Sequence, residues 1–166
     1  VSWNAVAQEN ARGTPIWKNG DLQTYSASLS GGLPSVRYHV SGNYDDDKGI
    51  EPNNEGRRFT GLVNVSIAPS QKVDVNASVN LLRGKTLLGS DYGIGAFWGS
   101  LYGSPLTATT ATRGFNIMPP EAVWAIFENS QDVARTTSSL GITHRPASWL
   151  SHRFIVGLDQ TSEDNR

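Results

Sequence analysis

The chain has 166 residues, a formal net charge of -1 and no cysteine. This length allows one domain with a core of its own. The near-neutral charge gives no electrostatic basis for binding nucleic acid, and the lack of cysteine excludes disulfides, thiolate metal sites and a cysteine nucleophile. No stretch approaches the roughly 20 apolar residues of a membrane-spanning helix. Neither a signal peptide nor an initiator methionine is present, so we expect a chain that is processed, trimmed or part of something larger.

Residues 1–21 are expected to be irregular or briefly helical, with Trp3 and Trp17 as anchors. A glycine, a proline and an Asn-Gly-Asp turn signal within this segment exclude a long helix. From residue 22 to residue 82 apolar and polar side chains alternate along four runs, and this period of two places successive side chains on opposite faces of a strand. The region is therefore predicted to be a four-strand meander, with strands at 24–30, 36–44, 58–67 and 72–81.

The connections between these runs alternate in length. A short turn at 31–35 is followed by a polar connection of about a dozen residues at 45–57 and by another short turn at 69–71. The segment 84–132 then lacks alternation and is rich in glycine and aromatic residues. We expect it to be a long loop with one short helical patch at 121–128, directly after a Pro-Pro pair, where proline is tolerated at a helix start.

A closing hairpin is predicted over 133–162, with strands at 135–144 and 150–161. Its turn at 145–148 repeats the proline-led turn that begins at Pro69. Tight turns on one side and generous loops on the other are typical of an outer-membrane barrel wall. The predicted fold is therefore an all-β antiparallel meander of about six strands, a segment of a large outer-membrane β-barrel. The alternative is an open sheet or a β-sandwich, which shows the same alternation when one face covers a core.

Residues 22–32, 36–44 and 48–50 closely resemble the opening barrel strands of the SusC/RagA-type TonB-dependent outer-membrane transporters. The Arg-Arg-Phe sequence at 57–59 and residues 149–159 are similar to the strands that follow in that family. The resemblance implies a part of a transporter wall in the outer membrane that imports a glycan- or peptide-derived nutrient. It implies no catalysis by this segment, and we expect no enzyme activity.

The chain departs from that family in size. Such transporters have 22 strands around a plugged lumen, whereas six strands are predicted here, with neither a plug nor a TonB-contacting segment. Single-chain barrels need at least eight strands, and unpaired strand edges in lipid leave backbone groups without partners. The expected partners are therefore the remaining barrel and plug of a longer chain, or other subunits that cover the edges. Two further expected partners are outer-membrane lipid and a surface lipoprotein. Nucleic acid is not expected as a partner.

The second hypothesis is a non-catalytic structural or accessory subunit whose sheet packs on a larger assembly, at the periplasmic face of a membrane complex. The two hypotheses differ in where the apolar stripe lies. Contact with lipid supports the transporter, and burial against a second sheet of the same chain supports the subunit. The positions that decide are Tyr25, Tyr38, Tyr44, Val63, Val73 and Val79.

Two groups of side chains are candidate binding sites, and no catalytic residue is predicted. Asp45, Asp47 and Glu51 belong to the densest acidic cluster, which would bind calcium or another hard cation, although the spacing of an EF-hand is missing. The alternative is a solvated loop, with no cofactor. Four aromatic residues of the long loop would stack on a sugar ring or pack on a peptide, unless they pack on their own barrel. They are Tyr92, Phe97, Trp98 and Tyr102.

The three histidines fall on separate predicted strands. They are His39, His144 and His152. No two of them have a metal-ligand spacing in the sequence, and each is expected to be a wall residue that faces water.

Overall fold

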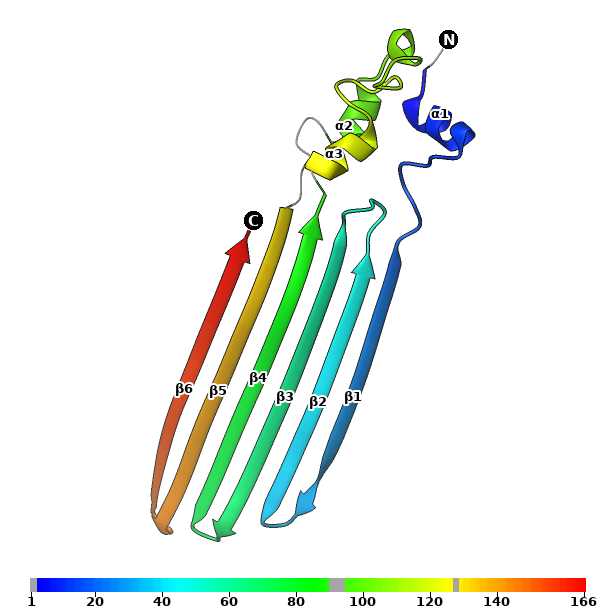
Figure 1. The fold of residues 1–166 in the computed structure, drawn as a ribbon. Helices are drawn as coiled ribbons and strands as arrows, with labels where there is room; N and C mark the ends of the chain where they lie inside the picture. Colours follow the sequence, from blue (N-terminus) through cyan, green and yellow to red (C-terminus); the bar gives the residue numbers. More distant parts are fainter. Residues whose placement is uncertain (1–2, 90–94, 127–128) are drawn as a thin grey trace.

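The computed structural model describes residues 3–89, 95–126 and 129–166. These residues form one six-stranded antiparallel sheet with a small helical cap at one end of it (Figure 1). Each strand pairs with its neighbours in sequence, in the order β1 to β6, so the predicted all-β meander is confirmed. The strands are β1 (Asp21–Leu33), β2 (Val36–Lys48), β3 (Glu55–Ser70), β4 (Val73–Leu88), β5 (Asn129–Ala147) and β6 (Leu150–Asn165).

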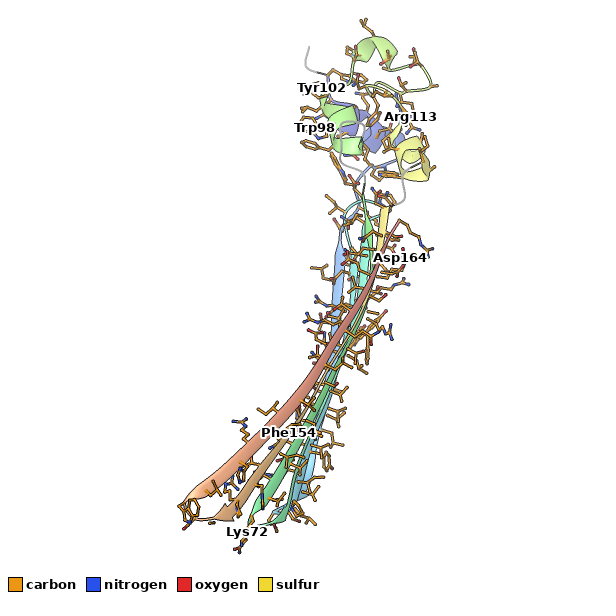
Figure 2. All side chains as sticks on the ribbon, turned by 90° about the vertical axis from the view of Figure 1, so that its left-hand side faces the viewer. Lys72, Trp98, Tyr102, Arg113, Phe154 and Asp164 are labelled. Atoms are coloured by element: carbon orange, nitrogen blue, oxygen red, sulfur yellow. The ribbon has the colours of Figure 1, made fainter. Side chains whose placement is uncertain are left out.

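The sheet is open and consists of a single layer (Figure 2). Within the described residues no second sheet packs against it, so this part of the chain is not a β-sandwich. The strands pair along nearly their whole length, and β1 and β6 are the two edges. The structure therefore shows the strands and their order, and leaves one edge of β1 and one edge of β6 without a neighbouring strand.

The connections alternate between short and long, as predicted. Very short turns at 34–35, 71–72 and 148–149 lie at the end of the sheet away from the cap, whereas the connections at 49–54 and 89–128 lie at the cap end (Figure 1). All the generous connections are thus on one side, as in an outer-membrane barrel wall.

The second connection is shorter than predicted. Residues 45–48 and 55–57 were expected in the loop because they are polar, but they belong to β2 and β3. Opposite charges face each other there, since Lys48 pairs in register with Glu55 and Asp46 with Arg57. Arg57 donates to the Asp46 carboxylate at 3.2 Å. Cross-strand charge pairs of this kind extend a ladder that an apolar pattern alone does not predict.

Both proline-led turns carry the same irregularity. The register shifts by one residue between Ile67 and Ser70 in the β3–β4 hairpin, and again between His144 and Ala147 in the β5–β6 hairpin. Proline cannot donate to a ladder and is found at bulges and strand ends, which explains why Pro69 and the equivalent Pro146 mark the shifts. The two proline-led turns that the sequence predicts to be alike therefore have the same irregular register in the structure.

The helical cap combines two parts of the chain that are distant in sequence. Helix α1 (Ala5–Arg12) comes from the N-terminal segment, and α2 (Ala96–Leu101), the 3₁₀ turn η1 (Pro105–Thr107) and α3 (Pro120–Ile126) come from the long connection. Ala5, Ile16, Ala96 and Phe115 are buried together at its centre. Trp3 and Trp17 pack against this cluster, as the anchor prediction requires, together with Val6 and Trp124.

The long connection is shorter than the predicted loop at 84–132, because residues 84–88 belong to β4 and residues 129–132 to β5, and it is also more structured. Its helical patch is confirmed as α3, which begins at Pro120, while residues 127–128 of the predicted patch lie outside the described residues. The loop packs on the N-terminal segment through the buried side chains of the cap. None of the helices in the described part of the chain has both the length and the hydropathy needed to cross a bilayer.

Candidate membrane and lumen surfaces

One face of the sheet carries a continuous apolar surface, which we call the apolar face. The register places Leu29, Val40, Val63, Val79 and Leu158 in one row across the sheet, interrupted only by a serine on β5. Directly paired residues have their side chains on the same side of an antiparallel sheet, so the whole row shares this face. Two further rows run parallel to it towards the short turns. They contain Tyr38, Val65, Ala77, Leu140 and Val156, and Leu33, Val36, Ile67, Val75, Ile142 and Phe154.

The apolar face is exposed. Tyr25, Tyr38, Tyr44, Val63 and Val79, the positions chosen from the sequence, are all exposed, and Val73 is half-buried. The side chains with the largest fractional exposure include Leu33 at 70% and Tyr25 at 60%. This apolar surface crosses all six strands without cover, and large exposed apolar patches mark protein or membrane contacts.

An aromatic row borders this surface on the cap side. Tyr25, Tyr44 and Phe59 are direct partners across β1, β2 and β3. On β4 the next position in the same row is Arg83, and the following row holds Arg57, Lys85 and other charged residues. The apolar surface thus ends where aromatic side chains give way to charges, which is the arrangement of the aromatic girdles of membrane barrels.

The cap-side border of the apolar surface slopes across the sheet. On β1 to β3 it reaches the aromatic row, but on β6 it ends at Leu158, two rows closer to the short turns. On the short-turn side, β6 continues on this face beyond Phe154, which shares the row of Leu33, through His152 to Leu150. A horizontal apolar band on strands tilted by 35–45° produces a slope of this kind.

The opposite face, which we call the polar face, is rich in hydroxyl and amide side chains. One row contains Ser30, His39, Asn64, Ser78 and Ser139. Ser30 and His39 are hydrogen-bonded at 2.7 Å, and the Ser66 hydroxyl donates to Asn76 at 2.7 Å in the next row. This face suits water or a polar solute and does not suit lipid.

Charges on the polar face occur largely as cross-strand ion pairs. Arg58 donates to the Asp45 carboxylate at 2.9 Å and 3.0 Å, and Asn43 and Thr24 donate to the other carboxylate oxygen. Arg135 and Asp159 form a second pair between β5 and β6. These side chains are therefore bonded to each other both along and across the strands.

The predicted acidic cluster is divided between a strand and a turn. The buried Asp45 carboxylate is already bonded to Arg58, and Asp47 lies on the same face of β2, opposite Gly56. Glu51 lies in the 49–54 connection and accepts a hydrogen bond from the Trp17 indole at 3.5 Å. The described residues contain no group of three or more acidic, histidine or cysteine side chains placed to hold a metal ion. Cation binding at these residues stays a prediction.

Three of the four predicted aromatic residues come together on α2 and its C-cap residue, Tyr102. Trp98 and Tyr102 are stacked, with ring centres 5.7 Å apart and planes at 11°, and Phe97 meets Trp98 edge-to-face at 5.5 Å. Phe97 and Tyr102 are exposed, while Ala96 and Gly99 on the same helix are buried. Figure 2 shows Trp98 and Tyr102 on the same side of the cap. Tyr92 lies outside the described residues. The three form an aromatic cluster that the long connection presents at the surface.

A buried carboxylate joins the two halves of the cap. Glu9 on α1 is 1% exposed and accepts hydrogen bonds from Arg12 at 2.6 Å and from the Thr14 hydroxyl at 2.7 Å. Arg113 of the long connection approaches the same carboxylate at 3.2 Å and pairs with Glu121 at 2.6 Å. Arg113 has a φ of 53°, an uncommon conformation for a residue with a side chain. No local sequence pattern links residue 9 to residue 113, so this cluster is visible only in the folded chain.

Two of the three histidines are neighbours in the sheet. His144 on β5 and His152 on β6 are direct register partners, and their ring centres are 6.1 Å apart. Both are exposed. The prediction of separate strands is confirmed, but the sequence did not reveal that the strands bring these two side chains together.

No protein-family model matches the chain, and no curated protein matches it either.

Proposed function

We propose that this chain forms part of the wall of a TonB-linked outer-membrane transporter that imports a glycan- or peptide-derived nutrient. The observation that carries the proposal is the exposed apolar face lying opposite a polar face on the same strands. The apolar face would contact the hydrocarbon of the outer membrane, and the polar face would line the lumen. The segment performs no catalysis. The resemblance of its strands to the SusC/RagA-type transporters supports the choice of this class among membrane barrels.

The height of the apolar surface supports contact with a membrane. On β1 it runs from Tyr25 to Leu33, eight residue steps. At about 3.4 Å per residue this is roughly 27 Å along the strand, or about 20 Å along the membrane normal for a tilt near 40°. The apolar band of outer-membrane barrels is about 25 Å tall. The two heights are close, and the charged rows then fall at the level of the headgroups.

The edges of the sheet support a larger wall. Six strands are too few for a closed barrel, and the outer edges of β1 and β6 have no partner strand among the described residues. In lipid each unpaired backbone group costs several kcal/mol, so both edges must pair with further strands. The remaining barrel and plug of a longer chain would supply them. The cap and the long connections would then lie outside the cell, with the short turns in the periplasm.

The test uses two adjacent residues of β4 that point to opposite faces. Because this chain has no cysteine of its own, Val79→Cys and Asn80→Cys each introduce one site for a nitroxide spin label in it, and any cysteine elsewhere in the full-length protein is first replaced by serine. Both residues are exposed, so access alone does not distinguish them. In the full-length protein in native outer membranes, we expect oxygen, which concentrates in lipid, to relax the label at position 79. A water-soluble nickel chelate should relax the label at position 80.

The outcome that contradicts a membrane wall is equally clear. If the nickel chelate reaches position 79 as readily as position 80, the apolar face is in water. If neither probe reaches position 79, that face is covered by protein. The latter result would favour the structural subunit that packs on a larger assembly.

A further inference from the structure

His144 and His152 form a cross-strand pair because of the register shift in their hairpin. Ala147 pairs with Leu150 next to the turn, so regular counting would place His152 opposite Arg145. The shift between His144 and Ala147 moves the register by one residue and places the two imidazoles side by side. Their rings are 6.1 Å apart between centres, with planes at 27°. The irregular turn therefore creates a pair of nitrogen ligands that a regular hairpin would separate.

We propose that His144 and His152 together bind a divalent transition-metal ion. Imidazole is a ligand for zinc, copper and nickel, and affinity for a nitrogen site rises along the series to Cu²⁺. Metal–nitrogen bonds of about 2.0–2.1 Å place the centres of two chelating rings roughly 4.5 to 5 Å apart. The observed separation of 6.1 Å is about 1 Å longer than this, and side-chain rotations that close the gap bring one nitrogen of each ring to a shared ion.

The pair is accessible in the described chain, because it lies one row beyond the last apolar row that crosses the sheet, at the level where the proposed membrane wall would meet the water of the periplasm. Both imidazole rings are exposed. The neighbouring Arg145 does not cover them, because it forms an ion pair with Asp74 on the polar face. The pair lies on the apolar face, one row beyond Ile142 and Phe154, at the short-turn end of the sheet. No third acidic, histidine or cysteine side chain of the described residues completes the group. Water would therefore fill the remaining positions of the ion, as it does where few protein ligands are present.

The site is independent of the proposed transport function. It requires only the β5–β6 hairpin and its register, and it would exist equally in a structural subunit. A bound ion would join the two strands near the turn and stabilise the hairpin, because a ligand that binds the folded state shifts the equilibrium towards it.

The experiment measures Cu²⁺ binding to the purified full-length protein by electron paramagnetic resonance and by quenching of tryptophan fluorescence. Trp149, which lies in the turn next to the pair and is 82% exposed, provides a nearby fluorophore. We expect His144→Gln and His152→Gln each to weaken Cu²⁺ binding at least tenfold. Removing a direct ligand should cost no less than removing a group that orients one, which costs about 10- to 100-fold. The double variant should lose little more than either single variant.

His39→Gln is the matched control, because the chain has only three histidines and His39 lies on the polar face, bonded to Ser30. It should bind Cu²⁺ as the unmodified protein does, with hyperfine coupling from two nitrogens. Far-ultraviolet circular dichroism checks that each variant keeps its strands. Binding that is unchanged in both hairpin variants, or lost equally in His39→Gln, would overturn the proposal. So would a spectrum with one coupled nitrogen in the unmodified protein.

Discussion

Glu9 shows how a single buried charge can hold a cap together. Its carboxylate accepts hydrogen bonds from Arg12 and Thr14 of its own segment. It also forms an ion pair with Arg113, which lies in a connection about a hundred residues away in sequence. Arg113 adopts a backbone conformation that costs energy for a residue with a side chain. The ion pairs to Glu9 and Glu121 offset that cost, so the carboxylate stabilises both the contact and the local turn.

We expect Glu9→Gln to destabilise the cap by about 2–3 kcal/mol. Breaking a buried ion pair costs about 3–5 kcal/mol, and the expected value is lower because both arginines reach solvent. Amide hydrogen exchange should increase in residues 3–17 and 95–126 while the sheet keeps its protection. Glu121→Gln is the control, because its side chain is 57% exposed and a surface pair contributes about 0–1 kcal/mol. Equal exchange in the two variants would contradict a special role for Glu9.

Trp98 is the residue through which the aromatic cluster of α2 would bind a ligand. It contacts both Phe97 and Tyr102, so removing its indole disrupts the whole cluster. If the proposed glycan or peptide binds here, we expect Trp98→Ala to weaken its binding about tenfold, since losing an aromatic contact costs on the order of 1–1.5 kcal/mol. Isothermal titration on the full-length protein measures this. Leu106→Ala, at a fully exposed position outside the cluster, should leave the affinity unchanged. An unchanged affinity in Trp98→Ala would remove the cluster from the binding site.

At the scale of elements, the strands were predictable and their ends were not. Alternation placed the four strands between residues 22 and 82, because each has one apolar and one polar face and a shift of one residue exchanges those faces. The closing hairpin was placed by its proline-led turn. The ends at 45–48 and 55–57 were missed, because there the strands are held by charge pairs across β2 and β3. Periodicity detects an apolar stripe. It does not detect a ladder built from opposite charges.

The core of the cap and the pairing of the two histidines could not be predicted from the sequence, for a different reason. The core of the cap joins Ala5 and Ile16 to Ala96 and Phe115, and no local pattern relates residues so far apart. Helix α2 is also too short to show a periodic face. The pairing of His144 with His152 depends on a register shift next to Pro146. The sequence shows the proline but not the direction in which the ladder shifts.

At the scale of the whole molecule, the sheet and the cap are stabilised differently. The buried apolar side chains of the described residues all lie in the cap, and none lies in the sheet. A sheet without a core of its own can expose its apolar face only where the surroundings are apolar, because such a face in water promotes aggregation. The cap, which has its own core, suits an aqueous environment. This division is what the proposed function requires, with the sheet in a membrane and the cap outside it.

This division leads to a prediction about assembly. Val63 lies in the central row of the apolar face, between Val40 and Val79, and the next residue, Asn64, points to the polar face. In the full-length protein, Val63→Arg should sharply reduce the amount in the outer membrane, because an arginine facing lipid at the midplane costs about 2–4 kcal/mol. Asn64→Arg adds the same charge one residue away, where it faces water, and should assemble normally.

Fractionation of cells and quantification of the protein in the outer membrane measure assembly, and uptake of the nutrient measures the transport that depends on it. Nutrient uptake by the Val63→Arg variant should fall in proportion to the protein present. Uptake by the unmodified protein should stop when a protonophore removes the energy that a TonB-linked importer requires. If both arginine variants assemble equally well, the apolar face does not contact lipid. If assembly differs but uptake continues without a proton gradient, the sheet belongs to a membrane wall that is not an energised importer.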